Sequence, residues 1–248
     1  MQYIDAFLSG YLILIDVLLV LGLVFFILLP KVERANKLYL LLLFILAFTI
    51  SYENFGGYLI YNTGLNTSIN AFLGNTENPK YNLWLFNLAA NSIIPCCYLL
   101  IISIYVSGRR KKLIFLMFFS FLSFLVISQL TNFEPVYGLQ PMRYSLGATF
   151  VMISCILFFM NLMKDPAYLE VNPLRLMSFW LVTVLLFYFS LTFLTNNSRE
   201  YLWQKQPLLA ESLALIDMVL GISCLVVIVL IIAAPNLKVK LEKEPAHA

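Results

Sequence analysis

The chain has 248 residues, of which 61% are hydrophobic and only 12% are charged, and its formal net charge is +3. Soluble domains hold roughly 45–50% apolar and about 25% charged residues, so this chain is too apolar for a soluble core and indicates a lipid environment. Disorder, nucleic-acid binding and a secreted disulfide scaffold are excluded, because charge is scarce and the four cysteines are dispersed.

Seven runs are long and apolar enough to cross a bilayer, which takes about 20 helical residues. In chain order they are residues 11–29, 38–61, 83–106, 113–130, 144–163, 176–195 and 208–234. Each run is continuously apolar rather than alternating, which favours helices over a barrel. The sequence therefore predicts an all-α membrane protein, a seven-transmembrane helix bundle in residues 1–234, with a short polar tail in 235–248. The longest connection, 62–80, is expected to consist of turns set by Asn, Thr, Gly and Pro.

Lysine and arginine are divided unequally between the two sets of connections. Twelve of the sixteen lie in the connections after the first, third and fifth spans and in the tail, and the other four lie in the connections after the second, fourth and sixth spans. Cytoplasmic connections carry the excess of basic residues. We therefore expect the amino terminus outside, the carboxyl-terminal tail in the cytoplasm, and a multi-pass location in a cell inner membrane.

Four acidic residues fall within the predicted spans: Asp16, Glu53, Glu211 and Asp217. No lysine or arginine lies deep in a span to neutralise them, and ionisable residues at membrane depth are functional candidates. Three states remain open for these carboxyl groups: protonation, a water-filled cavity or cation binding. Glu211 lies within a turn of the predicted outer surface, so an interfacial position also explains it.

Side-chain amides lie at a similar depth in the predicted bundle. Asn54 follows an acidic residue in the second span, and Gln129 ends the fourth span on the outer side. Asn87 and Asn91 are four residues apart, so they share one face of the third helix. All of these amides belong to the outer half of the bundle, whereas the cytoplasmic half is almost wholly aliphatic and aromatic.

Backbone features accompany the amides. Gly56 and Gly57 let a helix bend or a neighbour approach, and Pro95 continues the face of Asn87 and Asn91; these three residues are the expected hinges. Polar groups above an apolar base favour an outward-facing binding pocket. They do not favour a channel, which needs polar lining through its full depth. The alternative is that the amides only join helices by hydrogen bonds.

The chain lacks the common elements of catalytic and cofactor sites. Its single histidine, His247, is the penultimate residue, and all four cysteines fall within predicted spans. A metal or haem site is therefore not expected in the bundle. Glycine-rich phosphate loops and GxSxG elbows are also missing, and the seventh span has no lysine for a retinal Schiff base. We expect neither an enzyme nor a cofactor.

Several short stretches resemble a known family. They are Tyr81–Trp84, Arg109–Lys112, Asn172–Arg175, Ser178–Trp180 and Leu186–Ser190. Together with the span layout, they resemble small seven-span membrane proteins of Bacteroidetes that are often encoded beside a sensor histidine kinase or fused ahead of one. The resemblance implies a signal-input module that hands its state to a cytoplasmic partner.

These observations lead to one leading hypothesis and two alternatives. The leading hypothesis is a sensory or regulatory membrane module with an outward-facing pocket, whose partners are the lipid bilayer and a sensor kinase or other membrane subunit. The first alternative is a small transporter or ion-conducting protein in which Asp16, Glu53 and Asp217 take a proton or cation. The second is a structural subunit of a membrane complex.

Overall fold

The computed structural model describes residues 10–169 and 171–237. Six uninterrupted long helices are α2 (Gly10–Leu28), α4 (Lys37–Tyr61), α8 (Gly108–Leu130), α9 (Pro141–Lys164), α11 (Met177–Asn197) and α13 (Pro207–Ala233). A seventh is built from α6 (Leu83–Leu88), the π-helix η1 (Ala89–Ile93) and α7 (Ile94–Ile104). These seven are long and apolar enough to cross a membrane, and no strand occurs in the described ranges. The prediction of seven helices is confirmed; most of the predicted tail, 238–248, lies outside the described residues.

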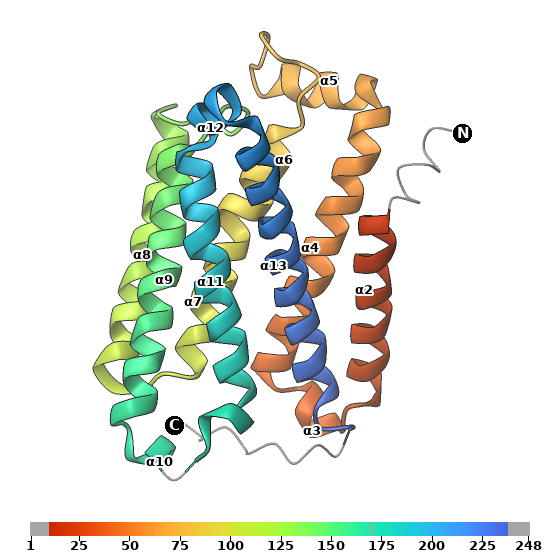
Figure 1. Cartoon of the computed structure of the whole chain (residues 1–248). Helices are drawn as coiled ribbons and strands as arrows, with labels where there is room; N and C mark the ends of the chain where they lie inside the picture. The colour runs from red at the N-terminus through yellow and green to blue at the C-terminus, as the bar shows by residue number, and fades with distance from the viewer. Residues whose placement is uncertain (1–9, 170, 238–248) are drawn as a thin grey trace.

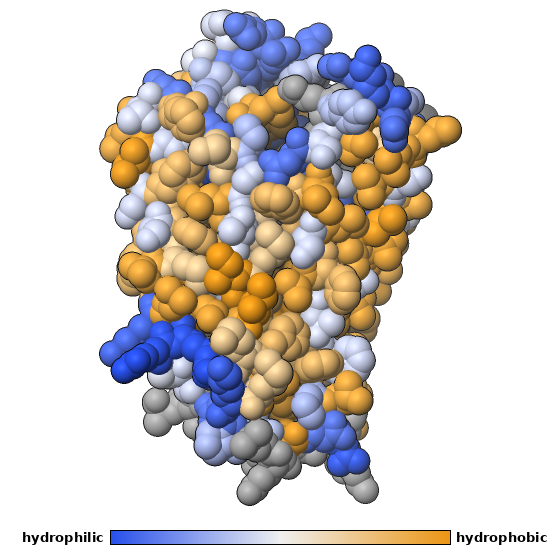
Figure 2. All heavy atoms as spheres, turned by 60° about the vertical axis from the view of Figure 1, so that its left-hand side comes forward, coloured by the Kyte–Doolittle hydropathy of each residue, from blue (hydrophilic) through white to orange (hydrophobic). Residues whose placement is uncertain are grey.

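Short helices divide between the two ends of the bundle (Figure 1). One end, called here the α5 end, carries α5 (Thr63–Phe72) and α12 (Arg199–Lys205). The opposite α3 end carries α3 (Lys31–Arg34), α10 (Pro166–Leu169) and the 3-10 turn η2 (Pro173–Arg175). Figure 2 shows a broad hydrophobic band between two hydrophilic ends on one face of the molecule. This distribution suits a bundle whose middle lies in hydrocarbon.

The connection 62–80 differs from expectation, because half of it is helical. The Asn62 side chain accepts a hydrogen bond from the Leu65 N–H at 3.2 Å and caps the start of α5. Asn66 and Asn70, one helical turn apart, are buried and bind the returning chain: Asn66 Nδ2 donates to the Lys80 carbonyl at 2.6 Å. The apolar side chains of α5 therefore point outward, and Phe72 is 89% exposed. An amphipathic helix of this kind suits the membrane interface.

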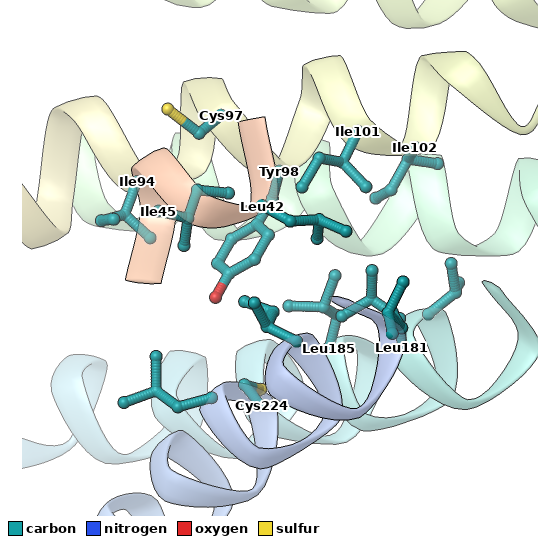
Figure 3. Packing of buried hydrophobic residues seen from close by; sticks show 14 of the residues in the cluster. Leu42, Ile45, Ile94, Cys97, Tyr98, Ile101, Ile102, Leu181, Leu185 and Cys224 are labelled. Atoms are coloured by element: carbon teal, nitrogen blue, oxygen red, sulfur yellow. The ribbon is translucent and has the colours of Figure 1, made fainter. Parts of the chain in front are cut away.

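The interrupted helix is the central element of the bundle. In the most apolar 18-residue stretch of this helix, 67% of the residues are buried inside the protein. The corresponding share in each of the other six long helices is 22–44%. The central helix packs against α4, α8 and α9, while α11 links α9 to α13, and α13 packs on α2. Figure 3 shows Tyr98 of α7 pointing across the core among side chains of α4, α11 and α13. Its ring lies 5.8 Å from the ring of Phe189 in an edge-to-face contact.

A buried polar cluster joins three elements at the α3 end. Asn161 of α9 is fully buried, and its Oδ1 accepts hydrogen bonds from Ser107 Oγ and Arg110 Nη1, both at 3.2 Å. Ser107 Oγ also donates to Asp165 Oδ2 at 2.7 Å. The turn between α7 and α8 is thereby fixed to the end of α9.

Helix packing predicts different responses to two glycine-to-alanine substitutions. A Cβ at Gly147 would lie 2.9 Å from Cζ of the buried Phe121, whereas one at Gly221 would lie 3.7 Å from Tyr188. Alanine adds up to about 1 kcal/mol of helix propensity at either site, but overpacking at Gly147 costs about 1–3 kcal/mol. We expect Gly147→Ala to melt at a lower temperature than Gly221→Ala in detergent. Equal melting temperatures would contradict this prediction and would show that the Phe121 ring can move away from an added Cβ at no measurable cost.

Candidate functional site

A polar pocket opens at the α5 end, between α6, η1, α9 and the last turn of α11. Its volume is about 610 Å³. Six of its eleven lining residues carry side-chain amides and none is charged: the lining is Asn82, Leu83, Phe86, Asn87, Asn91, Leu139, Gln140, Pro141, Tyr144, Asn196 and Asn197. Such a lining offers hydrogen-bond donors and acceptors without a net charge.

The irregular backbone of the third span lies in the wall of this pocket. Pro95 has no N–H to give to the carbonyl of Asn91, four residues earlier. The chain forms a wider turn here, in which the Ile94 N–H reaches the Ala89 carbonyl. Asn91 thus lies within the π-helix and borders the pocket. π-Helical turns occur frequently at functional sites.

Asn87 has the most hydrogen bonds among the amides of the pocket wall. Its Nδ2 donates to the carbonyls of Val136 and Gly138, both at 2.7 Å, and its Oδ1 accepts from Asn91 Nδ2 at 2.9 Å. The side chain is only 4% exposed. It therefore fixes the connection between α8 and α9, called here the 131–140 loop, against the central helix.

Glu134 and Arg143, two ionisable residues, connect the 131–140 loop to the start of α9 and to the end of α8. The buried Glu134 carboxylate accepts hydrogen bonds from the backbone N–H groups of Met142 and Arg143, at 2.8 and 2.9 Å. A carboxylate in this position satisfies two free N–H groups and complements the positive end of α9. Arg143 Nη2 returns to the Glu134 carbonyl at 3.2 Å and to Ser128 Oγ at 3.0 Å.

Gln140 presents an unused acceptor. Both of its Nε2 contacts are with carbonyl oxygens, those of Glu134 at 3.0 Å and Pro135 at 3.1 Å, which fixes the orientation of the amide. Its Oε1 is buried and has no partner among the described residues. An unpaired buried acceptor is costly, and this oxygen has no surface open to the pocket, so a shift of the Gln140 side chain would be needed before a bound molecule could donate to it.

Two of the predicted acidic and amide residues pair with one another away from the pocket. Asn54 Nδ2 donates to Asp16 Oδ1 at 2.8 Å and so connects α4 to α2. Glu53 is half-buried on the same helix. None of these three residues lines the polar pocket, so the structure separates them from Asn87 and Asn91.

The remaining predicted residues are also dispersed. Asp217 is half-buried and accepts a hydrogen bond from Thr195 Oγ1 at 2.7 Å, while its Oδ1 is buried and has no partner in the described chain. Glu211 is exposed near the start of α13. Gln129 is exposed and borders a different, apolar cavity against another face of the central helix.

The expected glycine hinge lies in regular helix. α4 continues through Gly56 and Gly57 to Tyr61. Gly56 instead allows a close approach, because a Cβ there would lie 3.0 Å from the ring of Phe86. Its carbonyl accepts from Asn82 Nδ2 at 3.2 Å, which joins α4 to the edge of the pocket.

Comparisons with protein-family models, curated proteins and solved structures give no match. The case for a site therefore comes from the geometry of this chain. The polar pocket residues that the sequence reasoning missed are Asn82, Gln140, Tyr144, Asn196 and Asn197. Four of them lie just outside the predicted spans, and the fifth, Tyr144, begins one. The available signal was the clustering of amides directly beside the outer ends of three spans.

The hydrogen bonds predict different roles for the two asparagines of the third span. Asn87→Leu removes the partners of two loop carbonyls, which we expect to cost about 1–3 kcal/mol and to lower the melting temperature. Asn91→Leu removes one hydrogen bond, to another side chain, so its melting temperature should fall less. Thermal denaturation followed by size-exclusion chromatography measures both. A larger loss for Asn91→Leu would contradict this assignment.

Proposed function

We propose that the chain is a multi-pass membrane protein of a cell inner membrane that acts as a sensory or regulatory module. Its α5 end faces outward, the polar pocket binds a small neutral molecule, and the bound state is passed to a partner at the cytoplasmic α3 end. One observation carries the proposal: the amide-lined pocket occurs at one end of the bundle, above a core filled by aliphatic and aromatic side chains.

The chemistry of the lining supports a neutral ligand rich in hydroxyl or N–H groups. No charged side chain lines the pocket. The nearby Glu134 carboxylate is occupied by backbone N–H groups. The amides of Asn91 and Asn196, which are not fully buried, supply hydrogen-bond donors and acceptors, and the aromatic rings of Phe86 and Tyr144 supply apolar contact. An ion would find no counter-charge on these walls.

The central helix supplies the route between the two ends. Its outer part carries Asn91 and the π-helix, and its last turn leads to Tyr105, whose carbonyl accepts a hydrogen bond from Tyr168 at 3.0 Å. A ligand that favours one arrangement of the π-helical turn would shift the helix below it and change the contacts at the α3 end. The resemblance to kinase-associated proteins favours a histidine kinase as the partner there.

Cysteine labelling tests the orientation. The four native cysteines are free and buried, so background reaction is low. Asn197→Cys on the rim of the pocket should react with a membrane-impermeant maleimide in right-side-out vesicles. Lys164→Cys, exposed at the end of α9 on the opposite side, should react only after permeabilisation. The reverse pattern would place the pocket in the cytoplasm and contradict the proposal.

Purification from native membranes tests the signalling role. The tagged protein is extracted in mild detergent, and co-purifying proteins are identified by mass spectrometry. We expect a kinase or other signalling protein in stoichiometric amount. Stable recovery of the chain without such a partner would count against the sensory role.

One observation favours the transporter alternative. Asp217 Oδ1 is buried without a partner in the described chain, and its neighbour Oδ2 is bound only by a hydroxyl. A carboxyl group in that state can take up a proton. Proton flux into proteoliposomes that Asp217→Asn abolishes and Glu211→Gln preserves would favour transport over sensing.

A further inference from the structure

A second cavity borders a different face of the central helix from the polar pocket, the face that carries Leu88, Ser92 and Cys96. It is an apolar groove of about 830 Å³ between α7 and α8, and α5 contributes to its outer end. Representative lining residues are Phe72 at the end of α5 and Leu73 directly after it, Ile93 and Leu100 of the central helix, and Leu122 and Val126 of α8. Exposed apolar side chains flank it on α8, so the groove opens to the surface that suits lipid.

A single cationic side chain lies in the lining of this groove. Arg143 is 4% exposed, and within the described residues its guanidinium donates hydrogen bonds only from Nη2. Its Nε is buried and has no partner. The Glu134 carboxylate offsets part of the charge, but its oxygens bind backbone N–H groups instead of the guanidinium. Nη1 has no hydrogen bond within the described chain either and, unlike Nε, is not fully buried, so it is the donor open to an acceptor that enters the groove.

The dimensions and polarity of the groove match one class of molecule. Its α8 wall runs from Phe118 to Leu130, about 18 Å at 1.5 Å per residue, which is enough for most of an extended acyl chain. Its only charged lining residue, Arg143, lies in the first turn of α9, at the α5 end. A chain of methylene groups with an anionic oxygen at one end satisfies both features.

We propose that the groove binds one acyl chain of an anionic phospholipid, whose phosphate is hydrogen-bonded by Arg143. The groove is separate from the polar pocket, so this site does not depend on the ligand or on the signalling role. Both cavities nevertheless border the 131–140 loop, since Val136 and Arg143 line the groove while Leu139 and Gln140 line the pocket. A bound lipid would therefore stabilise the position of Arg143, whose Nη2 donates a hydrogen bond to the Glu134 carbonyl of that loop.

Native mass spectrometry of the full chain in mild detergent tests this site. The probes are phosphatidylglycerol and phosphatidylcholine with identical acyl chains, added at equal concentration. Wild type should bind the first phosphatidylglycerol molecule about tenfold more tightly than phosphatidylcholine, since the guanidinium adds charge-assisted hydrogen bonds. Arg143→Gln should remove that preference and retain binding of the acyl chain.

A matched pair of leucine substitutions keeps the test decisive even where Arg143→Gln fails to fold. Leu122→Trp fills the groove from a half-buried position and should weaken binding of both lipids about tenfold, by excluding about two methylene groups. Leu116→Trp changes an exposed leucine of α8 outside the groove and should leave binding unchanged. Equal effects of the two substitutions, or no preference of wild type for the anionic lipid, would overturn the proposal and indicate general lipid contact only.

Discussion

In helices apolar enough to cross a membrane, polar side chains are stabilised chiefly by partners inside the protein, because hydrocarbon offers none. The backbone does so by helix formation, and the side chains do so by pairing across helices. Asn54 pairs with Asp16, Thr195 with Asp217, and Asn87 with two loop carbonyls. Each pair fixes the rotation of one helix against its neighbour, which apolar packing alone specifies weakly.

The same requirement gives the two ends of the bundle different properties. At the α3 end, Asn161 accepts hydrogen bonds from Ser107 and Arg110, and Asp165 accepts one from Ser107, so α9 is joined to α8 and to the turn before it. At the α5 end, more amides are present than internal partners, and Gln140 Oε1 and Arg143 Nε remain unpaired. The two ends therefore differ in how completely their polar side chains are paired, although the same apolar core lies between them.

Hydropathy predicts where a helix enters hydrocarbon, and this explains both the success and the errors of the sequence interpretation. All seven spans are present, but α8 begins at Gly108 rather than residue 113, because four basic residues form helix outside the apolar zone. The four-residue spacing of Asn87 and Asn91 placed them together correctly. Glu53 and Asp217 were expected nearby but line no part of the pocket, since hydropathy does not specify the rotation of a helix about its axis. Hydropathy also gives no information on how a connection folds back over the bundle, so the place of Gln140 in the pocket lining was not predicted.

The π-helical turn also sets an angular relation within the central helix. It contains one residue more than an α-helical turn, and one residue corresponds to about 100° of rotation. The extra residue therefore determines which face of α7 meets the core when Asn87 faces the 131–140 loop. Deleting one residue from Ala89–Ile93 would rotate all of α7 by about 100° relative to Asn87 and so turn Tyr98 away from Phe189. In this fold, a single inserted residue sets the rotation of the α7 side chains relative to those of α6 about the axis of the central helix.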